Sequence, residues 1–124
     1  MRKVIIGAAL AAMAAGTAQA QTAAPRPDQL AFRELYKELV ETNTALSAGS
    51  CTLAAERMAA RLKAAGMKDE QLTVFATPEK PKEGGLVAVY PGTSKKLKPM
   101  LLLAHIDVVE AKRSDWTRDP FTFI

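Results

Sequence analysis

The run Met100-Leu101-Leu102-Leu103-Ala104 decides the fold that this sequence predicts. It is apolar at every position, whereas a strand with one solvent-exposed face alternates apolar and polar residues. A strand without alternation is typical of a sheet that helices cover on both faces. The run therefore indicates an α/β fold.

A helical segment opens the part of the chain that we expect to fold. Asp28 can cap it, and its apolar residues recur at steps of three and four, which puts them on one face of a helix. These residues are Phe32, Leu35, Tyr36, Leu39 and Val40. We expect this face to lie in the core.

A second helix is predicted after the small, polar stretch 42–49, which breaks the first one. Ser50 or Thr52 can cap its start, and Gly66 stands where a left-handed residue would end it. The expected buried side consists of Leu53, Ala55, Met58, Ala59 and Leu62. Because so many of its residues are alanines, we expect this helix to pack closely against a sheet.

Two further strands are predicted between this helix and the apolar run. Residues 72–76 alternate and are β-rich, and residues 86–90 follow Gly84-Gly85. Residues 77–83 contain two prolines and several charges, so we expect a loop there. The lysines at 95, 96 and 98 predict a solvated turn, with a site for an anionic partner as the alternative. Two helices followed by three strands predict half of a three-layer α/β domain.

The N-terminal residues have the pattern of a signal peptide. Arg2 and Lys3 precede a short apolar stretch, and Ala18-Gln19-Ala20 is a small-x-small cleavage pattern. The stretch is shorter than the roughly 20 apolar residues of a membrane span. We therefore expect a signal peptide at 1–20, a flexible leader at 21–27, a domain at 28–124, and a mature protein in the periplasm or secreted, without a stable membrane anchor. An uncleaved anchor or an N-terminal helix is the alternative for the first twenty residues.

Charge and cysteine content exclude two classes of function. Without Arg2 and Lys3, 15 of the 17 basic groups remain against 13 acidic groups, which is too weak a surplus to predict nucleic-acid binding. Cys51 is the one cysteine and cannot form a disulfide within the chain. A catalytic cysteine would need a histidine as its base, and the one histidine of the chain, His105, is a candidate for another role. We therefore expect Cys51 to be a small, buried residue.

His105 and Asp107 follow the apolar run directly and are the candidate site residues. Ligands of open α/β sheets bind at the carboxyl ends of the strands, where His105 stands. Side chains two residues apart on an extended chain point to the same face. A neutral imidazole is a common zinc ligand, and a nearby carboxylate can orient it through the other ring nitrogen. The alternative is a hydrogen-bonded structural histidine at a strand end.

The stretch from Pro99 to Phe121 strongly resembles the first metal motif of the M-twenty family of metallopeptidases. That family, which includes aminoacylase, succinyl-diaminopimelate desuccinylase and glutamate carboxypeptidase, has a hydrophobic strand that leads into His-x-Asp-Val-Val. A loop with a tryptophan and then Asp-Pro-Phe follows, and here these are Trp116 and Asp119-Pro120-Phe121. Upstream segments at 38–44, 54–56, 62–66 and 85–88 are similar to the family's opening helices and preceding strand, in a more generic way.

The resemblance implies the N-terminal part of a three-layer α/β/α zinc-peptidase catalytic domain, two helices then three strands. It implies hydrolysis of amide bonds in peptides or N-acyl amino acids with two zinc ions, for which cobalt or manganese are alternatives. His105 would bind one zinc, and Asp107 would orient that histidine as the catalytic-site carboxylate. A smaller inserted domain of the family often dimerises, which implies a homodimer of the full-length form.

The family's bridging aspartate, glutamate pair and final histidine have no counterpart in the 124 residues. Residues 121–124 form a mainly apolar segment, which is unusual for a natural terminus. We therefore expect a fragment that is inactive alone and whose remaining ligands lie beyond Ile124. A non-catalytic periplasmic binding module or a vestigial module is the alternative. A binding domain unrelated to zinc would require the His105 segment to match by accident.

Overall fold

The structure is a computed structural model that describes residues 24–124. The expected signal peptide at 1–20 and residues 21–23 of the expected leader lie outside the described residues. The elements in chain order are α1 (Pro27–Val40), α2 (Cys51–Ala64), the 3-10 helix η1 (Asp69–Gln71), β1 (Leu72–Thr77), β2 (Lys80–Ala88) and the 3-10 helix η2 (Arg113–Asp115). The chain is therefore of mixed α/β type, as predicted.

The sheet is an antiparallel hairpin of β1 and β2. Strand β1 is confirmed at the predicted place, but the predicted loop at 77–83 is wrong, because β2 already begins at Lys80. Lys80 pairs with Thr77, and the next pair joins Gly84 to Ala76, so residues 81–83 lie outside the ladder. Pro81 has no backbone N–H to donate. Because it lies outside the ladder, no strand partner needs a hydrogen bond from it.

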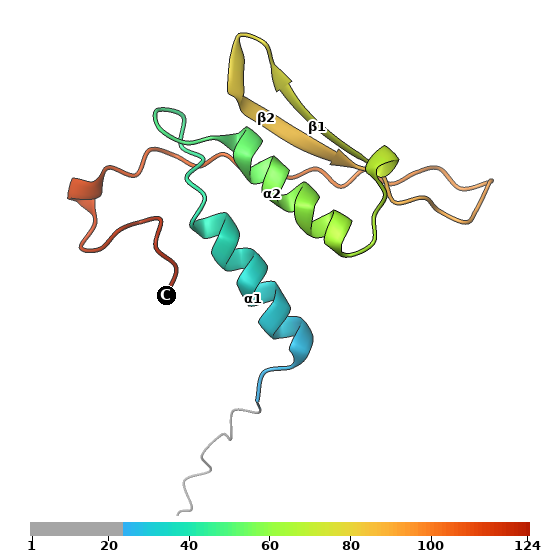
Figure 1. Ribbon diagram of the computed structural model, residues 1–124, viewed down its shortest axis with the longest axis horizontal. Coiled ribbons are helices and arrows are strands. Elements are labelled where there is room, and N and C mark those ends of the chain that lie inside the picture. The colour runs from blue at the N-terminus through green and yellow to red at the C-terminus, as the bar shows by residue number, and fades with distance from the viewer. Residues whose placement is uncertain (1–23) are drawn as a thin grey trace, which may run out of the picture.

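Helix α2 packs along the hairpin through small residues (Figure 1). Ala54 and Ala55 are 1% exposed and Ala59 is also buried, which confirms the close packing predicted from the alanines. The prediction is wrong for Leu53, which is exposed. The start of α2 is close to β2, where the Thr52 hydroxyl donates a hydrogen bond to the Pro81 carbonyl over 2.7 Å. A Cβ at Gly84 would collide with that hydroxyl and with the Phe75 carbonyl. Gly84 therefore permits this contact between helix and strand.

Both ends of α2 follow the sequence prediction. The Ser50 hydroxyl accepts a hydrogen bond from the Leu53 N–H over 3.1 Å, as an N-cap does. Gly66 has a φ of 99°, and the N–H groups of Gly66 and Met67 bond back to the carbonyls of Lys63 and Leu62. This pair of bonds is a Schellman motif.

Helix α1 differs from prediction at its start and on its apolar face. Arg26 is the N-cap, and Asp28 lies in the first turn, where its carboxylate forms an ion pair with Arg26 at 2.8 Å. None of the residues of α1 is buried, and Phe32 and Tyr36 are more than half exposed. The predicted core stripe is wrong, because the C-terminal segment covers this face only in part. Tyr36 has an edge-on contact with the Phe123 ring, and Leu35, Leu39 and Val40 are partly buried.

The predicted third strand at 100–104 is absent from the described part of the chain. The side chains of Met100 and of the three leucines at 101–103 are 84–90% exposed. Residues 99–104 take part in no hydrogen bond with other described residues. A strand needs a partner for its backbone groups, and β1 and β2 pair with each other instead. The segment after β2 runs out as a long loop and returns past α2 toward α1 (Figure 1).

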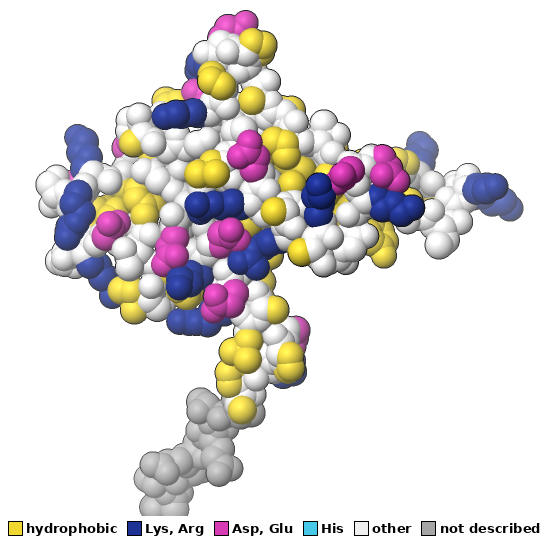
Figure 2. Space-filling view, in the orientation of Figure 1, with side chains coloured by type: hydrophobic (Ala, Val, Ile, Leu, Met, Phe, Trp, Pro, Cys, Tyr) yellow, Lys and Arg dark blue, Asp and Glu magenta, His cyan; other side chains and the backbone are white. Residues whose placement is uncertain are grey.

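Charges are mixed on the visible surface. Figure 2 shows lysine and arginine side chains interspersed with aspartate and glutamate over α1 and α2, without a large patch of one sign. Hydrophobic side chains gather on α1 near its start, in keeping with the exposure of Leu30 and Phe32. Among residues 24–124, neither helix is both long and apolar enough to cross a membrane.

Candidate functional site

The structure brings the two predicted site residues together. Nδ1 of His105 lies 3.2 Å from the Oδ1 atom of Asp107 and 3.2 Å from the Asp107 backbone carbonyl. An ionised carboxylate and a carbonyl can only accept hydrogen bonds, so Nδ1 must be the donor. A neutral ring that makes these contacts carries its proton on Nδ1, and the lone pair on Nε2 is left for another partner.

The pair lies on the surface. The His105 side chain is 86% exposed and that of Asp107 is 72% exposed. Water screens a contact between two such exposed groups, so it contributes little to folding. What the contact does is choose the ring tautomer, because a carboxylate beside one ring nitrogen fixes which nitrogen can bind a metal.

The donor set fits one ligand of a zinc site. Among residues 24–124, no group of three or more His, Cys, Asp or Glu side chains is arranged to hold a metal ion. Catalytic zinc is usually held by three protein ligands. The described residues therefore supply one imidazole with its lone pair available, together with the carboxylate that orients it.

The stretch after His105 lies along the turn between the two helices. The Thr44 hydroxyl donates to the Ile106 carbonyl over 2.7 Å, and Ala45 and Val108 form a parallel β-bridge. The N–H and the hydroxyl of Ser47 both donate to the Glu110 carboxylate, at 2.8 and 2.6 Å. Each of these contacts joins residues about 60 positions apart, and the sequence carries no local signal for them.

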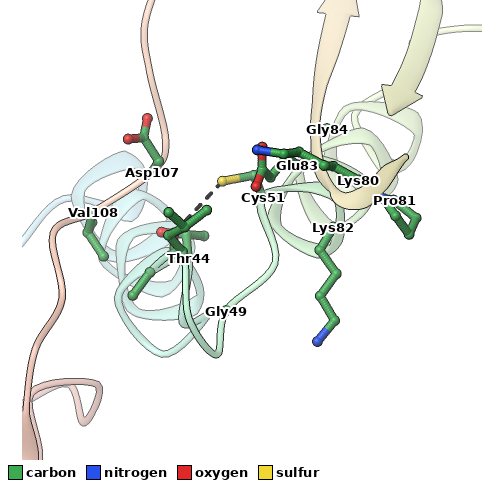
Figure 3. Close-up of a pocket in the computed structure, with 12 residues that line it drawn as sticks. Thr44, Gly49, Cys51, Lys80, Pro81, Lys82, Glu83, Gly84, Asp107 and Val108 are labelled. Atoms are coloured by element: carbon green, nitrogen blue, oxygen red, sulfur yellow. Dashed lines mark hydrogen bonds and ion pairs between the residues drawn. The ribbon is translucent and has the colours of Figure 1, made fainter. Parts of the chain in front are cut away.

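A cleft of about 650 Å³ opens beside Asp107. Figure 3 shows Asp107 on one side of it and Cys51 facing it from the start of α2, with Glu83 and Lys80 of the hairpin next to the thiol. Burial raises the pKa of the Cys51 thiol, and the negative charges of Asp107 and Glu83 add to this effect. The thiol is half-buried and donates a weak hydrogen bond to the Thr44 carbonyl at 3.8 Å, so the protonated, less reactive form is favoured, close to the sequence expectation.

A second, apolar cavity of about 480 Å³ lies on the His105 side of the same segment. Its walls come from Leu39 and Val40 of α1 and from Val109, Trp116 and Phe121. Trp116 is half exposed and offers no titratable group. The loop residues of the resembled motif thus shape the surroundings of His105 without adding a polar group to it.

None of the protein family models, curated proteins or solved structures compared with this chain matches it.

The functional interpretation of the chain therefore depends on its own residues around His105. The decisive geometry is the Nδ1 contact with Asp107, which leaves Nε2 available at the surface. The sequence does not predict Glu83, Thr44 or Ser47 as neighbours of this motif, because the hairpin and the turn approach it only through tertiary folding.

Proposed function

We propose that this chain carries the first zinc-binding motif of an exported metallohydrolase that cleaves amide bonds of peptides or N-acyl amino acids. The observation that carries the proposal is the contact between His105 and Asp107, which places the ring proton on Nδ1. In this proposal Nε2 of His105 binds one zinc ion, with cobalt or manganese as alternatives. Asp107 orients the ring and raises its basicity as a ligand.

The role of the described residues in the reaction is limited to holding and orienting. Zinc supplies the chemistry of such enzymes when bound, since it activates water and polarises the scissile carbonyl. Asp107 keeps the proton at Nδ1 of His105, and this prevents the ring from turning a protonated nitrogen toward the metal. A glutamate that moves the proton of the water, as the resembled family has, lies outside the contacts of this motif.

The proposal includes a larger architecture. The hairpin and the apolar run at 100–104 would belong to a three-layer α/β/α domain, in which the run becomes an interior strand. Support comes from the exposure of its leucines, which is costly in water and is relieved when a strand is buried on both faces. A cleaved signal peptide, a periplasmic or secreted location and a homodimer of the full-length form belong to the same proposal.

A metal titration of the 124-residue chain tests its part of the site. The chain has a single histidine, so the ring ¹⁵N signals are unambiguous. We expect zinc to bind weakly and without saturating stoichiometry in calorimetry, while shifting the Nε2 signal more than that of Nδ1. A shift confined to Nδ1, or no shift at millimolar zinc, would contradict the proposed ligand.

Activity is tested in the reading frame extended past Ile124. We expect His105→Ala to abolish hydrolysis of N-acyl amino acids and to lower the bound zinc. Asp115→Asn, an exposed acid on the same segment, serves as the control and should change neither. Retention of both activity and zinc by His105→Ala would refute the assignment.

A non-catalytic binding or vestigial module is the second candidate. The observation in its favour is that no group of three or more His, Cys, Asp or Glu side chains in the described residues is arranged to hold a metal ion, and that the thiol of Cys51, which lies near the motif, has a raised pKa. An extended frame without further acidic or histidine ligands would favour this candidate.

A further inference from the structure

We infer that the turn at 42–49 is a positioning device for the His105-Ile106-Asp107 tripeptide, with Thr44 and Ser47 as its positioning residues. The relevance to metal binding rests on the proposed function, whereas the positioning itself does not.

The first contact acts on the centre of the tripeptide. The Thr44 hydroxyl donates to the carbonyl of Ile106, which lies between the histidine and the aspartate, over 2.7 Å. Thr44 is 5% exposed, so water does not compete for its hydroxyl. The bond therefore fixes the peptide plane on which the relative direction of the two side chains depends.

Two further contacts fix the register of the segment. Val108 bridges to Ala45, and Glu110 accepts two hydrogen bonds from Ser47. The held positions are thus 106 and 108, through their backbone groups, and 110, through its carboxylate. His105, Asp107 and Val109 lie between and beside these positions, and none of the three side chains is used in the anchoring, in agreement with the 87% exposure of Val109.

The turn is rigid without help from the segment that it holds. The Thr42 hydroxyl donates to the Glu38 carbonyl of α1 and accepts from Arg57 of α2, both over 2.6 Å. The Asn43 side chain accepts from the Ala45 N–H over 2.8 Å. A Cβ on Gly49 would lie 2.5–2.7 Å from backbone atoms of Asn43 and Ala45, so only glycine fits this tight bend.

The consequence for the site is a fixed ring tautomer. With the Ile106 carbonyl held, Nδ1 of His105 stays within reach of both Asp107 acceptors. Loss of the Thr44 hydroxyl would free this peptide plane, lengthen the Nδ1 contact and let the proton move to Nε2. The lone pair would then be lost from the nitrogen that is proposed to bind metal.

The test measures the tautomer of His105 in the metal-free chain, from its ring ¹⁵N shifts at a pH where the ring is neutral. Thr44→Val keeps the shape of the side chain but removes the hydroxyl, and we expect the population with the proton on Nε2 to rise at least twofold. Thr44→Ser should restore the original shifts. Thr52→Val is the matched control, because it removes a 2.7 Å bond from a threonine hydroxyl to a backbone carbonyl at a different place.

Unchanged ring shifts in a folded Thr44→Val chain would overturn the inference, as would an equal change in Thr52→Val. If Thr44→Val does not fold, Glu110→Gln decides, since both Glu110 and Ser47 are exposed and their loss leaves the core intact. We expect a smaller shift in the same direction, and no shift would contradict the inference. Because the measurement uses no metal, a failure of the zinc assignment leaves its result unaffected, and the reverse holds as well.

Discussion

Cys51 shows how position sets the chemistry of a single side chain. Its thiol lies at the edge of the cleft beside Asp107, and burial together with two nearby carboxylates raises its pKa. The thiolate is the reactive form of cysteine, and these surroundings disfavour it. Exposure to the cleft therefore does not make this residue a nucleophile.

We expect Cys51 to react with iodoacetamide at pH 8 several-fold more slowly than the cysteine of an unstructured peptide, because less of it is ionised. Asp107→Asn should raise the rate modestly, by at most roughly twofold, since water screens exposed charges. Asp115→Asn removes a carboxylate that does not act on the thiol and should leave the rate unchanged. The chain has one cysteine, so mass spectrometry follows the reaction directly. A rate equal to that of the peptide would contradict this view.

Glu110 makes the anchoring of the motif depend on pH. The hydroxyl and the backbone N–H of Ser47 lower the pKa of the Glu110 carboxyl. A depressed pKa in the folded chain means that the contact is fully present above the ordinary glutamate value of about 4.3 and is lost as pH falls through the lower, folded value. In that acidic range we expect the NMR chemical shift of the Ser47 backbone amide to move toward the value typical of a disordered chain. In Glu110→Gln this acid transition should be missing, and its persistence would assign it to another group.

The helices and strands differ in how far the sequence alone predicts them. The helix cap and the Gly66 terminus depend on residues within one turn. The Gly66 terminus is confirmed, and Ser50 is one of the two caps that the sequence allows. The strand at 100–104 was wrong, because strand formation needs a hydrogen-bonded partner that the composition of the run cannot supply. The apolar stripe of α1 was wrong for the same reason, since periodicity identifies a face but not what covers it.

The candidate site follows the same division. The contact between His105 and Asp107 spans two residues, so the alternation of an extended chain was enough to expect it. The bonds from Thr44 to Ile106 and from Ser47 to Glu110 span 62 and 63 residues. Nothing in the small, polar stretch 42–49 distinguished a positioning turn from an ordinary loop.

The end of α2 offers a test of backbone strain without steric effects. Gly66 has a φ of 99°, and a Cβ there would meet nothing within 4 Å. Any loss of stability in Gly66→Ala therefore comes from the left-handed backbone, which costs about 1–2 kcal/mol for a residue with a side chain. Gly92→Ala is the matched control, because Gly92 has equal space and no positive φ. We expect urea unfolding to show the loss for Gly66→Ala alone, and equal effects of both variants would exclude strain as the cause.

Across the whole molecule, the apolar surface exceeds what the small core can bury. The buried apolar residues of the described part are Ala45 and three alanines of α2, Ala54, Ala55 and Ala59, while many large apolar side chains lie exposed, among them those along residues 97–103 and on α1. Soluble monomers rarely expose contiguous apolar patches of this kind. An extended apolar segment with unpaired backbone groups is also a template for pairing with another chain.

We therefore expect the 124-residue chain to bind the dye ANS and to sediment faster as its concentration rises. Leu102→Lys should reduce both effects, because a charge in the centre of the run opposes its burial. Ala60→Lys adds the same charge at an exposed position of α2 and should leave both effects unchanged. If Leu102→Lys binds as much dye as the parent chain, the apolar run at 100–104 is not the surface that binds ANS and associates. In the extended reading frame, the proposed interior strand makes the opposite prediction for the same leucine: ANS binding is low at the start, and Leu102→Lys destabilises the fold.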